Sequence, residues 1–386
     1  MKKILNKKLN IFIKFIMTHR YHKVEPTSNN NNGFVAHDSI DFLLTADADR
    51  NLEHESIFIK YDIVVNSVND TVKVLGDDIR LENGSVIFDQ FRTEVESKGM
   101  VENLLNYPRY CSTVDKLTKS KGNLFNSIDQ VEGNQISDFG AKMNAEQQCT
   151  QTGGFVAKFN RSFCVKPKIC FNRAVGGQYS FKNGYIKVSC ILARDSKALY
   201  GLYPDLNNPN YRITNVSLYY ETIPNELANK QPMMMFSYKS IKANINSQEN
   251  NISAQVPSEN CSGFFMNFIS QARENVFTNN SQALEVLHGV NAVRFLFNSN
   301  LGQRVAYKLE DLGEMQSQAI QVLSDSGYNQ INSNAMHENN GFVLGLNFDQ
   351  MVNLVNTNVQ VNISLDSSFS GSVHNVYMYF MEIIKM

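Results

Sequence analysis

The chain has 386 residues, of which 42% are hydrophobic and 19% charged, and its formal net charge is −1. This length exceeds one small domain and suits two, and the near-neutral balance argues against a protein that binds nucleic acid over its whole surface. Phe and Tyr are plentiful, Trp is absent and Asn occurs throughout. Such a composition favours strands, turns and polar loops over long helices.

The first residues, MKKILNKKLNIFIKFIM, are basic and apolar. Lys7, Lys8 and Lys14 interrupt the apolar run, so it fits neither a secretory signal peptide nor a bilayer-spanning helix. We expect residues 1–37 to form a flexible basic leader. Three roles stay open for it: a segment upstream of a true start at Met17, an amphipathic helix that touches a membrane, or an arm that touches nucleic acid.

The six cysteines include no C-x-x-C pair. Together with the missing secretory signal, this indicates reduced thiols in a cytosolic or nuclear protein that is not secreted. Cys190 alternates with Ile186, Val188 and Leu192, so we expect it in the core.

Several segments of the first half show the two-residue alternation of half-buried strands. The clearest is 57–65, where one face carries Ile57, Ile59, Tyr61, Ile63 and Val65. Similar segments lie at 155–165, 185–193 and 211–223.

Between these segments, the sequence RLENGSVIFDQFRTEVESKGMVENLLNYP predicts a strand over 86–96. After Gly99 we expect a short helical piece that Pro108 stops, because proline is unfavourable inside a helix. A second helix is predicted near 110–120.

Residues 224–232, PNELANKQP, place two prolines around a polar stretch and are the predicted linker. The predicted units are therefore 38–223 and 233–386.

Strand patterns resume after the linker. The last of them, SVHNVYMYFMEII, is apolar on both faces, so we expect a strand that is buried on both sides or covered by a neighbouring subunit. A helix is predicted over 310–327, with Met315, Ala319, Val322 and Leu323 as its apolar stripe and Gly327 as its C-cap. A shorter helical segment is predicted after Asn280, with Ser281 as its N-cap.

Candidate chemical sites are weak. His19 and His22 have helical spacing but lie in the leader, and a lone pair there is a poor metal site. Residues 47–55 begin like a calcium loop, but Leu52 and Phe58 occupy its glycine and final glutamate places. Glu94 and Glu96 share a strand face, where they are expected to solubilise it. The sequence predicts no catalytic residue, no cofactor site and no metal site.

The opening stretch resembles the first jelly roll of double jelly-roll major capsid proteins, found in virophages, Polinton or Maverick elements and related eukaryotic DNA viruses. The matching motifs, in chain order, are 82–84 (ENG), the strand 86–96, Gly99, 101–102 (VE) and 104–107 (LLNY). Further segments that resemble this family are TGGFVAKFNRSFCV, YRITNVSLYYETIPNE and ENVFTNNSQALEVLHGVNAVRFLFNS, so the resemblance extends over about residues 38–384.

The resemblance implies an all-β fold of two tandem jelly-roll β-sandwiches with a few short helices in loops. It also implies a capsid subunit, not an enzyme, that forms homotrimers and then pseudo-hexagonal capsomers of an icosahedral, virus-like shell. The implied partners are other copies of the chain, penton or minor capsid proteins and an internal membrane, without sequence-specific nucleic acid. The implied location is the virion capsid, assembled in the host cytoplasm or nucleus.

Three other functions stay open from the sequence. One is a β-sandwich binding module for glycans or proteins, expected to show a shallow polar groove ringed by Tyr. Another is a tandem β-sandwich hydrolase, which needs a deep cleft with two ionisable groups of shifted pKa. The third is a scaffold protein related to capsid subunits.

Overall fold

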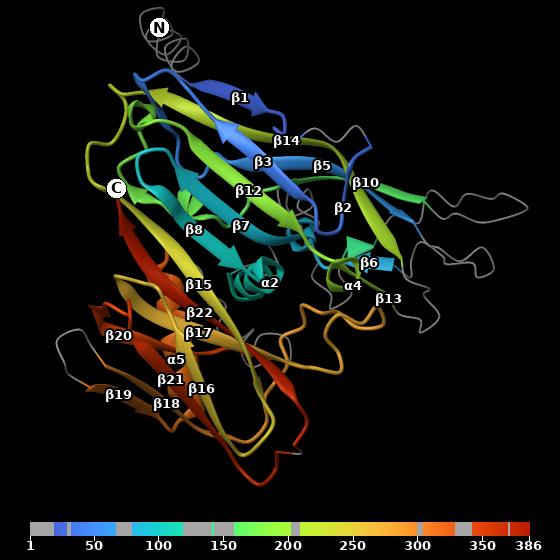
Figure 1. The fold of residues 1–386 in the computed structure, drawn as a ribbon, viewed down its shortest axis with the longest axis vertical. Coiled ribbons are helices and arrows are strands. Elements are labelled where there is room, and N and C mark those ends of the chain that lie inside the picture. The colour runs from blue at the N-terminus through green and yellow to red at the C-terminus, as the bar shows by residue number, and fades with distance from the viewer. Residues whose placement is uncertain are drawn as a thin grey trace, which may run out of the picture.

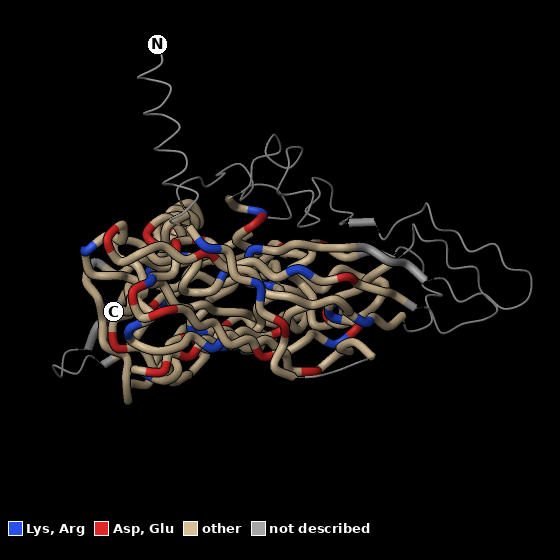
Figure 2. Tube along the Cα trace, turned by 90° about the horizontal axis from the view of Figure 1, so that it is seen from above, with Lys and Arg blue, Asp and Glu red and all other residues tan. Residues whose placement is uncertain are grey.

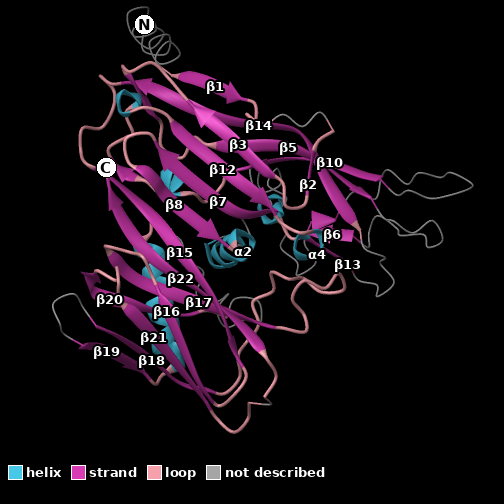
Figure 3. Ribbon diagram, in the orientation of Figure 1, coloured by secondary structure: helices cyan, strands magenta, loops and turns pink. Residues whose placement is uncertain are grey.

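The computed structural model describes residues 19–28, 32–66, 79–118, 141–142, 158–201, 209–298, 304–328, 342–369 and 371–386. Strands dominate these residues (Figure 3), and the α-helices among them are α2 (Tyr107–Thr118), α4 (Asp195–Ala198) and α5 (Leu312–Asp325). The predicted all-β class is confirmed. The strands form two sandwiches that follow one another along the chain (Figure 1).

The first sandwich consists of two antiparallel sheets, A and B. Sheet A has the order β1 (Arg20–Val24), β14 (Asn210–Pro224), β5 (Phe58–Asn66) and β10 (Lys158–Val165), and β14 also pairs with β2 (Phe34–Val35) and β4 (Arg50–Leu52). Sheet B has the order β3 (Ser39–Leu44), β12 (Ile186–Leu192), β7 (Phe88–Val95) and β8 (Gly99–Leu105). A small sheet adds β13 (Leu199–Gly201), β6 (Ile79–Leu81) and β9 (Ala141–Lys142).

The core of the first sandwich follows from the alternation in β5. The side chains of its apolar face are fully buried, as predicted from the two-residue period. Tyr61, in the middle of this face, packs its ring against Phe88 of sheet B and Phe163 of β10, with centroid distances of 5.8 and 5.5 Å. Its hydroxyl donates a hydrogen bond of 2.5 Å to the carbonyl of Gly84. Cys190 is also fully buried, as expected.

The second sandwich consists of sheets D and E. Sheet D has the order β11 (Val175–Gly176), β15 (Met233–Ile245), β22 (His374–Lys385), β17 (Cys261–Ser270) and β20 (Leu344–Val352). Sheet E has the order β16 (Glu249–Gln255), β21 (Asn358–Leu365), β18 (Val290–Asn298) and β19 (Arg304–Leu309). If β15 to β22 are numbered 1 to 8, sheet D reads 1-8-3-6 after β11 and sheet E reads 2-7-4-5. This alternation between two sheets is the strand order of a jelly roll.

Sheet D is buried on both faces, because alternate side chains enter different cores. On β17, Phe264 packs at 4.9 Å from Phe295 of sheet E, whereas the next residue, Phe265, faces Tyr110 of α2 at 6.2 Å. On β22, Tyr379 lies on the face toward α2 and Phe380 on the face toward sheet E. The prediction of a final strand buried on both sides is thus confirmed within one chain.

Helix α5 covers one face of sheet D at very close range. A Cβ added to Gly345 would lie 2.8 Å from the Cα of Ala319, and one added to Gly263 would lie 2.8 Å from Cγ2 of Val322. Glycine at these two strand positions therefore lets the helix backbone approach the sheet. The predicted apolar stripe of this helix is fully buried, and Gly327 follows its end with φ +91°.

Sheets B and D lie side by side, with β8 next to β15 (Figure 1). At one end of this contact Nζ of Lys98 donates to the carbonyl of Lys385 at 2.7 Å, and at the other Oγ of Ser240 donates to the carbonyl of Leu105 at 2.9 Å. Both sandwiches therefore contribute to one broad layer. Residues 225–232, which join β14 to β15, connect the two halves.

Two predicted helices are wrong. Residues after Gly99 form β8 and not a helical piece, because Gly99 (φ +76°) turns the chain into a hairpin with β7. Pro108 does not stop a helix; it lies in the first turn of α2, where its missing N–H is not needed. The segment from Ser281 to Leu287 forms no helix, and the carbonyls of its first three residues are hydrogen-bonded to Arg109 and Lys116 of α2 instead.

The predicted flexible leader, residues 1–37, needs correction for its later part. Strand β1 and the short β2 lie within it, and both pair with β14. The sequence does not predict β1 and β2, because neither segment shows an apolar alternation of its own. Both form as strands because β14 supplies their backbone hydrogen-bond partners. Residues 1–18 lie outside the described residues.

Charges of both signs are interspersed over the described body (Figure 2). In the parts of the chain that the structure describes, no helix has the length and apolar character needed to cross a membrane.

Candidate functional site: the seam between the two sandwiches

Ionisable and aromatic side chains gather between sheet D and the first sandwich. We call this layer the seam; it contains α2, the 3-10 turn η3 (Cys170–Arg173) and the residues that follow α5. Helix α2 lies near the middle of the molecule, and most of its side chains are buried (Figure 1). It begins directly after Asn106, whose backbone is left-handed with φ +52° and whose carbonyl accepts the amide of Tyr110 at 3.3 Å.

Arg109 of α2 joins the first sandwich to the second. Its side chain is only 1% exposed, and its guanidinium donates to four acceptors of the second half. These are Oδ1 of Asn267 (2.6 Å) and the carbonyls of Phe268 (2.6 Å), Ala283 (2.8 Å) and Ser281 (2.9 Å). A buried cation is tolerated only when its donors are satisfied, so these contacts fix the position of α2 on the second sandwich.

Further contacts hold the Arg109 side chain in place. Nδ2 of Asn267 donates to the hydroxyl of Thr113 at 2.9 Å, and this hydroxyl donates to the carbonyl of Arg109 at 2.7 Å. The guanidinium carbon also lies 5.1 Å from the centre of the Tyr377 ring, within cation–π distance. Burial lowers the pKa of Arg109, and the surrounding tyrosines and carboxylates oppose that shift.

Glu274 supports this arrangement from the far side of Tyr377. It accepts hydrogen bonds from the Tyr377 hydroxyl and the Asn375 amide, and Nζ of Lys242 lies 2.9 Å from its carboxylate. Burial acts to raise the pKa of Glu274, but the hydrogen bond from Tyr377 and the charges of Lys242 and Arg109 outweigh it and lower this pKa. The carboxylate is therefore ionised at neutral pH.

A fully buried ion pair also lies in the seam. Glu102 of β8 is fully buried; its carboxylate lies 2.6 Å from Nη2 of Arg173 and accepts the amide of Cys170 at 2.8 Å. Burial raises the pKa of Glu102, while the Arg173 guanidinium and the Cys170 amide act in the opposite direction. The pair holds η3 against sheet B.

Aromatic rings of both sandwiches surround Arg173. Its guanidinium lies 4.9 Å from the ring centre of Tyr238 and 5.3 Å from that of Tyr110, and it donates to the Tyr110 hydroxyl. The hydroxyls of Tyr110 and Tyr328 are 3.0 Å apart. Tyr238 and Tyr328 belong to the second half, so the cation is shared between the two sandwiches. Sharing of this kind resists relative sliding, because movement would unpair buried polar groups.

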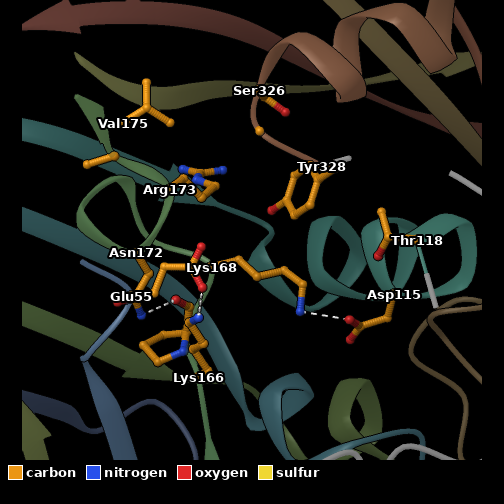
Figure 4. Close-up of a pocket in the computed structure, with 13 residues that line it drawn as sticks. Glu55, Asp115, Thr118, Lys166, Lys168, Asn172, Arg173, Val175, Ser326 and Tyr328 are labelled. Atoms are coloured by element: carbon orange, nitrogen blue, oxygen red, sulfur yellow. Dashed lines mark hydrogen bonds and ion pairs between the residues drawn. The ribbon is translucent and has the colours of Figure 1, made fainter. Parts of the chain in front are cut away.

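A cavity of about 370 Å³ opens next to Arg173 and Tyr328 in the seam (Figure 4). Its lining includes Lys168 of the loop before η3 and Tyr328 after α5. Nζ of Lys168 lies 2.8 Å from the Asp115 carboxylate, and Lys166 is paired with Glu55. Both lysines of the lining are thus paired with carboxylates of the same lining, an arrangement that suits cohesion of the seam.

The comparisons with known proteins agree with this architecture. No family model matches the chain, and no curated protein matches it. Among solved structures, the Faustovirus major capsid protein matches with a TM-score of 0.60 and 8% sequence identity, over 95% of this chain and 90% of that chain. A chain of the Sputnik virophage structure matches with a TM-score of 0.60 and 11% identity, over 95% of this chain and 86% of that chain.

The fold is a double jelly roll. The fold expected from the sequence motifs is thus confirmed, and the seam is the layer in which the two rolls of the double jelly roll contact each other.

Most candidate residues from the sequence lie away from the seam; Glu55, the last residue of the calcium-loop candidate, lines the cavity and is paired with Lys166. His22 is in β1, and Asp47 lies 3.0 Å from Nη1 of Arg20, so both are on the outer part of the first roll. Glu94 is on β7, and Glu96 lies beyond the strand, where it accepts the amide of Tyr185 at 3.2 Å. No group of three or more metal-ligating side chains occurs among the described residues.

Sequence reasoning missed Arg109, Glu102 and Arg173. One signal was present for Arg109, which follows Pro108 and lies between two tyrosines, Tyr107 and Tyr110, at the start of the helical segment. Glu102 alternates with apolar residues in a strand that the sequence did not reveal as one. Nothing in the local pattern predicts Arg173, because its partners come from segments far away in the chain.

Proposed function

We propose that the chain is a structural capsid subunit, which trimerises into pseudo-hexagonal capsomers of an icosahedral shell. The observation that carries this proposal is the double jelly-roll fold, which matches the Faustovirus major capsid protein over nearly the whole length of both chains. The proposal applies equally to a viral gene and to a gene of an integrated, Polinton-like element.

The seam supports this role physically. Three copies of a chain with two similar rolls present six similar corners, which can tile a surface only if the two rolls keep a fixed relation. Arg109, the Glu102–Arg173 pair and the shared tyrosines supply that rigidity inside one chain. In this proposal the two rolls are the predicted units 38–223 and 233–386, the first completed by β1 and β2, and 224–232 is the linker between them.

The outward face of sheet B supports lateral contacts between copies. Leu43, Met100 and Leu105 are exposed on this layer, by 38%, 58% and 40%. Lys187 and Glu94 lie between Leu43 and Met100 in one cross-strand row. Apolar side chains interspersed with charges are typical of protein interfaces, in which burial supplies energy and charge sets register.

The remaining parts of the proposal follow from that role. The subunit would contact other capsomers, penton or minor capsid proteins and an internal membrane, and its location would be the virion capsid after assembly in the host cytoplasm or nucleus. A scaffold protein related to capsid subunits has the same fold and is the second candidate.

Electron microscopy of the purified full-length chain tests the proposal. We expect threefold-symmetric particles with a hexagonal outline, alone or joined into sheets and shells. Curved assemblies that dissociate when shells mature would favour the scaffold role. Uniform single-chain particles at every concentration would refute both, and would direct attention to the binding-module alternative.

A further inference from the structure

The N-terminal strand β1 lies at the edge of sheet A and continues into sheet B. It pairs with β14 through a register of five residues, from Arg20 with Thr222 to Val24 with Leu218. After it, the amide and hydroxyl of Thr27 both donate to the carbonyl of Asp41 on β3, at 2.8 and 3.1 Å. Residues 20–28, which we call the strap, therefore tie the two sheets of the first roll together.

His22 is the main side-chain contact of the strap. Its ring is stacked on Tyr220 of β14, with a centroid distance of 4.6 Å and an interplanar angle of 9°. Its Nε2 lies 2.9 Å from the hydroxyl of Thr222. Thr222 is fully buried, and the same hydroxyl accepts a hydrogen bond of 2.9 Å from Nε of Arg50.

These contacts bear on the protonation state of His22. Arginine can only donate, so the Thr222 oxygen is the acceptor for Arg50 and its own hydrogen is available for Nε2 of His22. A neutral imidazole with an unprotonated Nε2 accepts this hydrogen bond, whereas an imidazolium would have to donate to the hydroxyl oxygen that already accepts from the Arg50 guanidinium. Docking of the strap therefore favours neutral His22, because protonation brings a second cation onto the hydroxyl that Arg50 uses.

The cationic side chains around His22 also disfavour its protonation. Arg50 of β4 is 5% exposed and donates to the Thr222 hydroxyl that His22 also contacts. Nη1 of Arg20 in β1 lies 3.0 Å from the carboxylate of Asp47, in the loop before β4. Burial, then Arg50, then Arg20 lower the pKa of His22, and Asp47 opposes them. Glu221, the acidic side chain of this part of β14, is paired with His19.

We propose that the strap is an acid-released latch, in which protonation of His22 places a second cation beside Arg50, on the Thr222 hydroxyl that both side chains contact, so that β1 leaves β14. Release exposes the backbone edge of β14, an edge that can pair with a strand of a second copy of this chain.

The direction of the pH effect follows from the lowered pKa. A docked state that binds the proton more weakly than the free segment loses stability as the pH falls below the ordinary histidine pKa of 6.5, and continues to lose it down to the pKa of the docked state. Above that window docking is complete. Release of β1 does not depend on the proposed capsid role, because the contacts that hold β1 lie within one chain.

Hydrogen exchange of the full-length chain, followed by mass spectrometry, tests the latch. Protection factors, corrected for the intrinsic effect of pH, are compared from about pH 7.5 to about pH 5, the range in which histidine titrates. We expect the amides of the strap to lose protection across this range while those of β22 keep theirs. Retained protection of the wild-type strap at the acidic end would overturn the proposal.

Three variants identify the titrating group. His22→Phe keeps a ring on Tyr220, and His22→Gln keeps an acceptor for Thr222; neither can be protonated, so we expect strap protection in at least one of them to become independent of pH. His19→Gln is the matched control and should behave like the wild type. Two results would show that His22 is not the titrating group of the latch. One is loss of the pH dependence of strap protection in His19→Gln. The other is a His22 variant whose strap is protected at neutral pH and still loses that protection in acid.

Discussion

Replacement of Arg109 by methionine tests whether this side chain locks the two rolls together. Methionine fills a similar volume without any donor, so the four acceptors of the second half lose their partner. The Phe268 carbonyl keeps a backbone amide at 3.0 Å, which leaves unpaired the buried acceptors of Asn267 and Ser281 and the half-buried carbonyl of Ala283. At about 1–2 kcal/mol for each unpaired buried acceptor, Arg109→Met should lower the free energy of unfolding by about 3–5 kcal/mol.

One effect works against this loss. Arg109 is a buried cation, and its removal recovers part of the free energy spent on desolvation. Because of this gain, the expected loss of unfolding free energy stays at about 3–5 kcal/mol and does not reach the sum of four hydrogen bonds to a charged group. Arg92→Met is the matched control, because Arg92 is exposed on β7 of the same roll. Its effect should stay within about 0.5 kcal/mol.

Urea unfolding at equilibrium, followed by far-UV circular dichroism and tyrosine fluorescence, measures both variants. In Arg109→Met we expect a lower midpoint and separate transitions for the two rolls, because the seam no longer couples them. A loss below about 1 kcal/mol with one shared transition would refute the reasoning, since it would mean that packing alone joins the rolls.

Glu102→Gln breaks the buried ion pair and should lower the free energy of unfolding by about 3–5 kcal/mol. Adding Arg173→Met to the same chain should restore part of this loss, because the unpaired cation is then removed. If urea unfolding shows that the losses of the two single variants simply add in the double variant, the two side chains are not coupled. Gly345→Ala should lower thermal stability by about 1–3 kcal/mol, because the added Cβ would clash with the α5 backbone. Gly313→Ala, in the first turn of α5, is the control and should be neutral or stabilising. Equal melting temperatures for the two variants would contradict the close approach of α5 to sheet D. Glu274 has a lowered pKa, so its contribution is complete above the ordinary value of 4.5 and is lost as the pH falls through the lower pKa of the folded protein. Stability measured against pH should therefore fall less steeply in acid for Glu274→Gln than for the wild type, and parallel curves would show that this carboxylate does not contribute.

The sequence predicts strands well where a strand has one wet face and one buried face. Residues 57–65 are such a case, since their alternation directly reflects the environment in sheet A. It also predicts α5, because the helical stripe from Met315 to Leu323 is buried against a single sheet. In these elements the local pattern and the tertiary contacts agree.

Prediction fails where distant segments decide the local structure. Strand β8 carries buried Glu102 among apolar residues, and only the partner Arg173 makes that burial possible. The segment after Ser281 has a helix-like pattern, yet its carbonyls are hydrogen-bonded to Arg109. Most of the seam could not be found from the sequence for the same reason: Glu102 and Arg173 are 71 residues apart in the chain, and Arg109 and Asn267 are 158 apart.

The mass of the purified chain in dilute solution at neutral pH, measured by light scattering after size exclusion, tests the capsid-subunit account most directly. The account predicts a stable species of three times 43.7 kDa that persists on dilution. A species that remains at 43.7 kDa at all concentrations would contradict it.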